Sequence, residues 1–136
     1  MTIDKTALLG YHNSGGMELD TIRLQKAGYA VTTADSLDGM LEKMGIRQGS
    51  QNAVPTNKFG VYIMDLNLGK PGSESYSPAE IIYNFVRSDV ESGQAVFMGL
   101  SGNDFTVTHA KIAGIPCIGN TEFDKFDEFL ISLKNK

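Results

Sequence analysis

Short apolar segments alternate with longer amphipathic segments along the whole chain. Five of the apolar segments are rich in β-branched and aromatic residues, namely residues 6–11, 29–33, 59–64, 95–100 and 115–118. They are continuous runs rather than alternations of apolar and polar residues, which is typical of strands buried on both faces of a parallel sheet. We therefore predict five parallel strands.

Helical patterns fill the intervals between these strands. Residues 77–80 (SPAE) form a capping box with proline at the first helical position, which predicts that a helix starts there. Gly28 and Gly114 follow two other helical segments and can end them in the left-handed conformation. The segment that ends at Gly114 is the fourth predicted helix, around residues 105–113. In the last helix the apolar residues recur at spacings of three and four: Phe123, Phe126, Leu130 and Leu133.

This alternation of strand and helix, repeated five times, predicts an α/β fold with a central five-stranded parallel sheet and helices on both faces. The crossovers in such a doubly wound sheet are right-handed, and its ligand site lies beyond the carboxyl ends of the strands. A chain of 136 residues has the size of one domain, so we expect residues 1–136 to form a single unit.

Polar residues follow the predicted strands at this end of the sheet, and Asp65 is the most informative of them. It directly follows the apolar run 60–64, so we expect its carboxylate to project from a buried strand toward the predicted site. A carboxylate in that place either caps the following turn or is a reactive group. His12, Asn67 and Ser101 also lie at or just after strand ends, and we expect them near Asp65.

Two connections are longer than the two to six residues that are usual in α/β folds. Residues 45–58 lead into the amino end of the third strand, away from the predicted site. Residues 66–77 begin at the site itself and could cover it. The other interpretation of both segments is a tolerated surface insertion.

The composition excludes several classes of protein. Hydrophobic residues make up 41% of the chain, enough for a full core, and one cysteine excludes an internal disulfide framework or a cysteine-rich zinc site. The sequence has no apolar run long enough to span a membrane and no signal-peptide pattern, so we expect a cytoplasmic protein with no membrane association. Twelve basic against sixteen acidic residues, with no basic cluster, argue against a nucleic-acid partner.

Four segments of the chain resemble the receiver domain of two-component response regulators, the CheY-like family. They are VTTADSLDGMLEKM, VYIMDLNLG, VFMGLSGN and AGIPCIGNTEFDKFDEFL, in residues 31–44, 61–69, 96–103 and 113–130. The resemblance implies a flavodoxin-like (βα)5 fold and a role in signal transduction or a phosphorelay. It also implies no enzymatic activity beyond phosphorylation and dephosphorylation of the chain itself.

The resemblance assigns a role to three of the residues at the strand ends. Asp65 matches the aspartate that accepts a phosphoryl group from a histidine kinase. Asn67 matches the residue whose backbone carbonyl binds Mg²⁺, so Asp65 and Asn67 are the implied metal ligands. Ser101 matches the serine or threonine that binds the phosphoryl group and switches position.

Two other features of the family are not matched. The acidic pair that holds the metal falls on Tyr11 and His12, or on His12 and Asn13, and neither alternative contains a carboxylate. The lysine that ends the fifth strand is absent from residues 119–123 (GNTEF). Because Mg²⁺ is usually held by carboxylates, we expect weak or absent metal binding and impaired phosphotransfer. His12, as an imidazolium, could offset charge beside Asp65.

Three functions remain open. The first is a stand-alone atypical receiver that meets a sensor histidine kinase or phosphotransfer protein and passes its signal to an effector. In the family the effector surface corresponds to residues 104–133, and a homodimer is also possible. The second is a degenerate receiver acting as an interaction module independent of phosphorylation. The third is a flavodoxin-like binder of a small ligand, using the backbone N–H groups of residues 14–16 (SGG) as an anion site.

Overall fold

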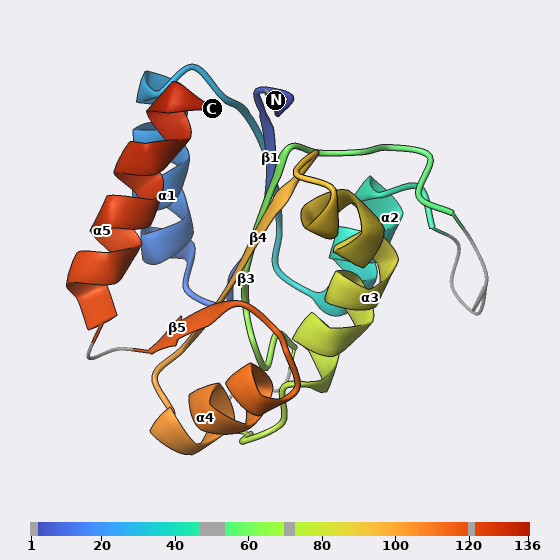
Figure 1. Ribbon diagram of the computed structural model, residues 1–136, viewed down its shortest axis with the longest axis vertical. Helices are drawn as coiled ribbons and strands as arrows, with labels where there is room; N and C mark the ends of the chain where they lie inside the picture. Colours follow the sequence, from blue (N-terminus) through green and yellow to red (C-terminus); the bar gives the residue numbers. More distant parts are fainter. Residues whose placement is uncertain (1–2, 47–53, 70–72, 120–121) are drawn as a thin grey trace.

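One parallel sheet forms the middle of the molecule, with its strands in the order β2-β1-β3-β4-β5. The structure is a computed structural model that describes residues 3–46, 54–69, 73–119 and 122–136. The predicted five-stranded (βα)5 fold is confirmed (Figure 1). The strands are β1 (Thr6–Gly10), β2 (Ala30–Ala34), β3 (Val61–Asp65), β4 (Val96–Ser101) and β5 (Cys117–Gly119).

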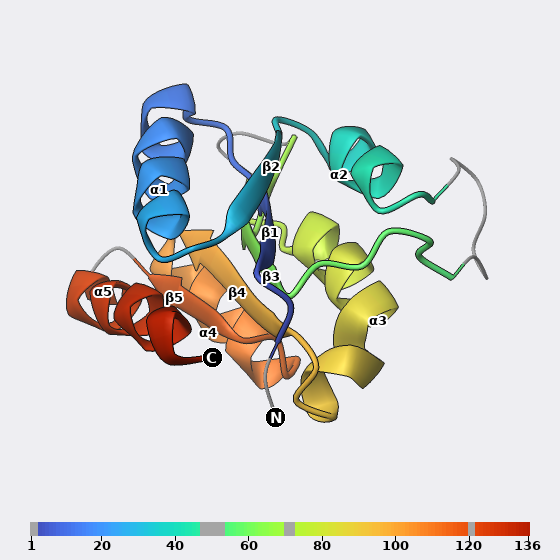
Figure 2. The ribbon, with the colours of Figure 1, turned by 90° about the horizontal axis from the view of Figure 1, so that it is seen from above.

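Helices cover both faces of this sheet. Helices α1 and α5 lie on one face, and α2, α3 and α4 lie on the other (Figure 2). The helices are α1 (Ser14–Lys26), α2 (Leu37–Lys43), α3 (Ser77–Glu91), α4 (Asp104–Ile112) and α5 (Phe123–Ser132), which continues as the 3-10 helix η2 (Leu133–Asn135).

Successive residues of the central strands supply two separate cores. Leu8 of β1 and Tyr62 of β3 point toward α2, α3 and α4. Their neighbours Leu9 and Ile63 point toward α1 and α5. All four are at most 1% exposed, which explains why these strands read as continuous apolar runs.

Four of the five strands, β2 to β5, end one residue later than the sequence predicts, whereas β1 ends one residue earlier. Because β3 ends at Asp65 and β4 at Ser101, both residues belong to the sheet itself rather than to the loops that follow. Phe59 and Ala95 were expected to open these strands, but they pack against the core just before them. The sheet therefore fixes the backbone of both candidate site residues.

The predicted helix ends are confirmed, and α3 starts one residue earlier than the capping-box pattern predicts. Gly28 and Gly114 have φ angles of 94° and 85° and follow α1 and α4. Helix α3 begins at Ser77 itself, without a side-chain cap. Pro78 has no N–H to satisfy, and the next one, of Ala79, donates to the backbone carbonyl of Leu66 at 3.3 Å. The backbone of the preceding loop therefore satisfies one of the N–H groups in the first turn of α3.

The helices in the described part of the chain are all too short or too polar to cross a membrane.

Candidate functional site

A pocket of about 360 Å³ opens at the carboxyl ends of β1, β3 and β4. It brings together the four residues that the strand-end analysis places there. Its walls are His12, Asn13, Asp65, Asn67, Ser73, Leu100, Ser101, Gly102 and Asn103. The parallel register explains this grouping, because Gly10 of β1 pairs with Met64 of β3, and Asp65 pairs with Leu100 of β4.

Asp65 is half-buried at the end of β3 and is held by the backbone of the β1–α1 loop. The N–H of His12 donates a hydrogen bond of 2.7 Å to its Oδ2. Burial raises the pKa of the Asp65 carboxyl, and the hydrogen bond and charge of His12 partly lower it again. One of the two carboxylate oxygens is therefore already engaged within the protein.

His12 also contacts the second residue expected to hold a metal. Its Nε2 lies 3.1 Å from the backbone carbonyl oxygen of Asn67. Since a carbonyl oxygen can only accept, Nε2 is the donor in this hydrogen bond. His12 thus links β1 to both Asp65 and Asn67, by its backbone and its side chain respectively.

Tyr11, the other residue at the expected acid-pair position, is turned away from the pocket. It is buried, and its hydroxyl donates to Oδ2 of Asp20 on α1 at 2.7 Å. Burial and the nearby Asp20 carboxylate raise the pKa of the Tyr11 phenol, so it stays protonated as a donor. Of the two residues, His12 is therefore the one that faces Asp65.

Three other polar side chains of the pocket wall, those of Asn13, Ser101 and Asn103, accept hydrogen bonds from backbone N–H groups at or near the starts of α1 and α4. Oδ1 of Asn13 accepts from the N–H groups of Gly15 at 2.8 Å and Gly16 at 3.1 Å. These N–H groups were two of the donors expected for an anion site at residues 14–16, and they have an internal partner. Oδ1 of Asn103 accepts from the N–H of Thr106, and Oγ of Ser101 accepts from the N–H of Asn103. Asn13 and Asn103 are N-caps that the sequence analysis missed, although asparagine just before a helix is a usual signal.

The residues of this pocket do not fit a magnesium site. Mg²⁺ requires oxygen ligands in octahedral geometry and is usually held by one or two carboxylates. Among the pocket residues that the structure describes, Asp65 is the single carboxylate, and the carbonyl of Asn67 is bonded to His12. No group of three or more histidine, cysteine or acidic side chains that could hold a metal occurs within the described ranges.

The long β3–α3 connection lines part of the pocket through Asn67 and Ser73, and residues 70–72 within it lie outside the described residues. Nδ2 of Asn67 donates to the carbonyl of Ser73 at 3.0 Å. The hydroxyl of the buried Thr106, on α4, donates to the carbonyl of Glu74 at 2.9 Å. The loop thus connects the pocket to the first turn of α4. In the other long connection, residues 47–53 are outside the described residues.

After β5 the chain has the carboxylate of Glu122, in the segment where the family resemblance implies a lysine followed by a proline. Residues 120 and 121 lie outside the described residues. Glu122 accepts hydrogen bonds from Lys125, Lys111 and the N–H of Gly119. These contacts, that of Lys125 above all, lower the pKa of the Glu122 carboxyl to about 2. The charge of Glu122 is thereby paired with lysines of α4 and α5.

No family model and no curated protein matches the sequence. Among solved structures, the receiver domain of HemR from Leptospira biflexa is 18% identical, with a TM-score of 0.62 over 96% of this chain and 94% of that chain. A response regulator from Burkholderia pseudomallei, solved with a phosphorylated aspartic acid and a calcium ion, is 22% identical with a TM-score of 0.60. That match covers 86% of this chain but 60% of the other.

The receiver domain of a sensor histidine kinase from Pseudomonas aeruginosa, solved with magnesium in its active-site cleft, is 13% identical. Its TM-score is 0.56 over 96% of this chain and 98% of that chain. The chain therefore has the receiver fold that its sequence resembles.

Proposed function

From this receiver fold, we propose that the protein is an atypical receiver domain of a two-component signalling system whose output is contact with a partner protein. Its upstream partner is a histidine kinase or phosphotransfer protein, and its downstream partner is an effector. Asp65 is the candidate phosphoacceptor and Ser101 the candidate switch residue. Phosphotransfer that depends on Mg²⁺ is impaired or lost.

One observation carries this proposal: His12 binds Asp65 through its N–H and Asn67 through Nε2. The oxygens that the family resemblance assigns to the metal are therefore hydrogen-bonded to the backbone N–H and the imidazole of His12, whose side chain offers no oxygen ligand. Phosphoryl transfer depends on neutralising charge on the transferred group, normally by metal ions and cationic side chains. Replacing a carboxylate by His12 removes the attraction for that metal at this position.

The proposed effector surface lies on α4 and α5. Phe105 and Ile112 are 57% and 78% exposed and lie seven residues apart on α4, so they share a face of the helix. Ile131 on α5 is 60% exposed. Large apolar side chains exposed on the two helices that contact β5 are suited to a protein partner.

The test is whether a carboxylate at position 12 restores metal-dependent phosphorylation. We expect the wild-type protein, incubated with acetyl phosphate, to gain phosphoryl mass slowly or not at all, with little response to Mg²⁺. His12→Asp should be labelled at least about tenfold faster with Mg²⁺ than without it, which means that Mg²⁺ lowers the activation free energy by about 1.4 kcal/mol or more. Intact mass spectrometry measures both rates.

Two matched variants complete this test. His109→Asp makes the same charge change on the exposed face of α4, outside the Asp65 pocket, and should behave like the wild type. His12→Asp/Asp65→Asn should not be labelled. Fast Mg²⁺-dependent labelling of the wild type, unchanged in His12→Asp, contradicts the proposal. Absence of labelling in every variant favours the interaction module that works without phosphorylation.

A further inference from the structure

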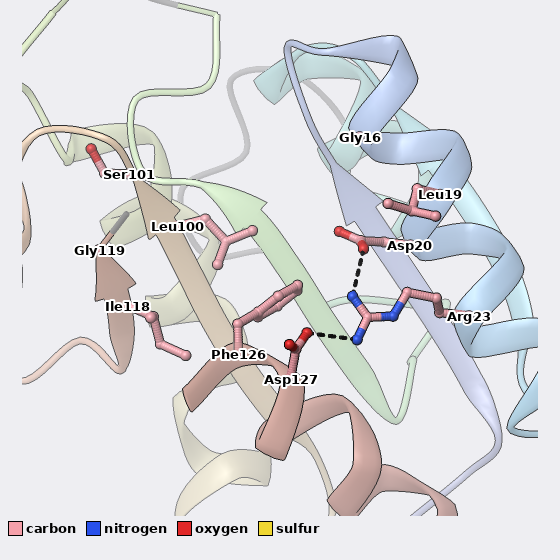
Figure 3. A pocket seen from close by; sticks show the side chains of 10 residues that line it. All are labelled: Gly16, Leu19, Asp20, Arg23, Leu100, Ser101, Ile118, Gly119, Phe126 and Asp127. Atoms are coloured by element: carbon pink, nitrogen blue, oxygen red, sulfur yellow. Dashed lines mark hydrogen bonds and ion pairs between the residues drawn. The ribbon is translucent and has the colours of Figure 1, made fainter. Parts of the chain in front are cut away.

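A second cavity, of about 460 Å³, lies between α1 and α5, on the face of the sheet that these two helices cover (Figure 3). Its volume falls within the roughly 300–1,000 Å³ of small-molecule sites. Leu100 and Ser101 at the end of β4 line both this cavity and the Asp65 pocket. The site described above does not account for it.

The greater part of the cavity wall is apolar. Leu100 and Ile118 form its floor on β4 and β5, and the ring of Phe126 projects over the sheet from α5 (Figure 3). Leu19 of α1 lies at the rim of the cavity. Its side chain is 58% exposed, so the cavity opens to solvent on this side. This wall suits an aromatic or alkyl group, which gains free energy in proportion to the apolar area that it buries.

The opposite part of the wall is charged, and its charges do not cancel. Nη2 of Arg23 pairs with Oδ1 of Asp127 at 2.8 Å, and Nη1 lies 3.8 Å from Oδ1 of Asp20 (Figure 3). The other oxygen of Asp20 accepts from the Tyr11 hydroxyl. One guanidinium thus faces two carboxylates, and this side of the cavity carries a net charge of about −1 at neutral pH.

We propose that this cavity binds a small organic primary amine, with its aromatic or alkyl body on Leu100, Ile118 and Phe126 and its ammonium group beside Asp127. The ammonium group supplies three donors and the positive charge that the two carboxylates lack. An organic anion of the same shape meets two carboxylates instead. This inference does not depend on the function proposed above.

Tryptamine is a suitable probe because the chain contains no tryptophan, so indole fluorescence reports the ligand alone. Adding the intact protein to tryptamine should raise its fluorescence anisotropy, with half-saturation below about 1 mM. Tryptophol and indole-3-acetate share the ring but carry a neutral and an anionic group. We expect affinity to fall in the order tryptamine, tryptophol, indole-3-acetate.

Variants of the charged wall should change tryptamine affinity in opposite directions. Asp127→Asn should weaken binding about tenfold, equivalent to about 1.4 kcal/mol, whereas Arg23→Gln should strengthen it several-fold. Asp124→Asn removes an exposed carboxylate of the same helix that does not line the cavity, and should leave the affinity within about twofold.

A third variant tests the location of the ligand. Leu19→Phe adds volume at the cavity wall and should weaken binding, while Ile22→Phe adds the same ring outside it on α1 and should not. The proposal is overturned if no probe binds, if indole-3-acetate binds as tightly as tryptamine, or if Asp127→Asn and Asp124→Asn behave alike. Both residues are exposed, so neither substitution threatens folding.

Discussion

The two faces of the sheet are filled differently, although the same strands supply both. We call the face covered by α2, α3 and α4 the closed face, and the face covered by α1 and α5 the open face. On the closed face, helix α3 buries five residues, four of which are apolar side chains in the core: Ala79, Ile82, Tyr83 and Val86. Helix α1, on the open face, buries two residues, Leu24 and the charged Asp20. Helix α3 therefore contributes more apolar side chains to the core than helix α1 does. Where α1 brings Asp20 and Arg23 instead, a cavity remains beside α5.

The largest expected contrast comes from truncating one phenylalanine on each face. Phe97 is 2% exposed and its ring packs edge-on against Tyr83, with centroids 5.1 Å apart. Phe97→Ala should lower the free energy of unfolding by about 3–5 kcal/mol. Phe126 already borders a cavity, so Phe126→Ala should cost less than about half of that. Denaturant unfolding measures both values, and equal losses would show that the two faces are packed alike.

Replacing a glycine by alanine should lower the stability of the protein on the closed face and raise it on the open face. A Cβ at Gly10 overlaps the side chain of Met40 and lies 2.8 Å from Cδ2 of Leu68, and both side chains are fully buried on the closed face. Gly10→Ala should therefore cost about 1–3 kcal/mol. A Cβ at Gly16, at the cavity wall, lies 3.9 Å from the nearest side-chain atom, Cδ2 of Tyr11.

Gly16→Ala should instead stabilise the protein by about 0.5–1 kcal/mol, because alanine loses less conformational freedom in a helix. Thermal and denaturant unfolding of the two variants side by side test this difference. A loss of stability in Gly16→Ala would mean that the open face has no room for the methyl group.

The smallest expected effect concerns the charge buried on the open face. Burial raises the pKa of the Asp20 carboxyl, although Tyr11 and Arg23 partly lower it again. Ionising Asp20 therefore costs more free energy in the folded state than in the unfolded chain. This cost lowers the free energy of unfolding as the pH rises above the ordinary aspartate pKa. Asp20→Asn should thus gain stability relative to the wild type between pH 4 and pH 7.

The measurement is the difference in unfolding free energy between Asp20→Asn and the wild type, followed across that pH range. Asp124→Asn, which replaces an exposed carboxylate on α5, is the reference. A difference that does not change with pH for Asp20→Asn would assign Asp20 an ordinary pKa.

The fold was predictable because its signals are local. The apolar runs, the helical spacing and the glycines after α1 and α4 each depend on a few neighbouring residues. The grouping of Asp65, Asn67, Ser101 and His12 also followed from the sequence, since parallel strands bring their carboxyl ends to one edge of the sheet. The hydrogen bond from the N–H of Ala79 to the carbonyl of Leu66 was not predictable from the capping-box pattern, because it joins residues thirteen positions apart.

The chemistry inside the two cavities was not predictable in the same way. The hydrogen bond from His12 to Asn67 joins residues 55 positions apart, and its existence depends on the relative placement of two loops. The cavity between α1 and α5 depends on how two helices rest on the sheet, which a pattern of apolar and polar positions does not specify. Arg23 and Asp127 read as solvated helix residues until their helices are brought together.

The short edge strand β5 has a consequence for the breathing of the molecule. It is three residues long and pairs with β4 alone, whereas β1 and β3 pair on both sides. Amide hydrogens near β5 should therefore exchange with solvent through local opening, and those of β1 and β3 only through global unfolding. Since Ile118 and Gly119 of β5 line the cavity beside α5, a ligand held there should slow amide exchange first along this edge.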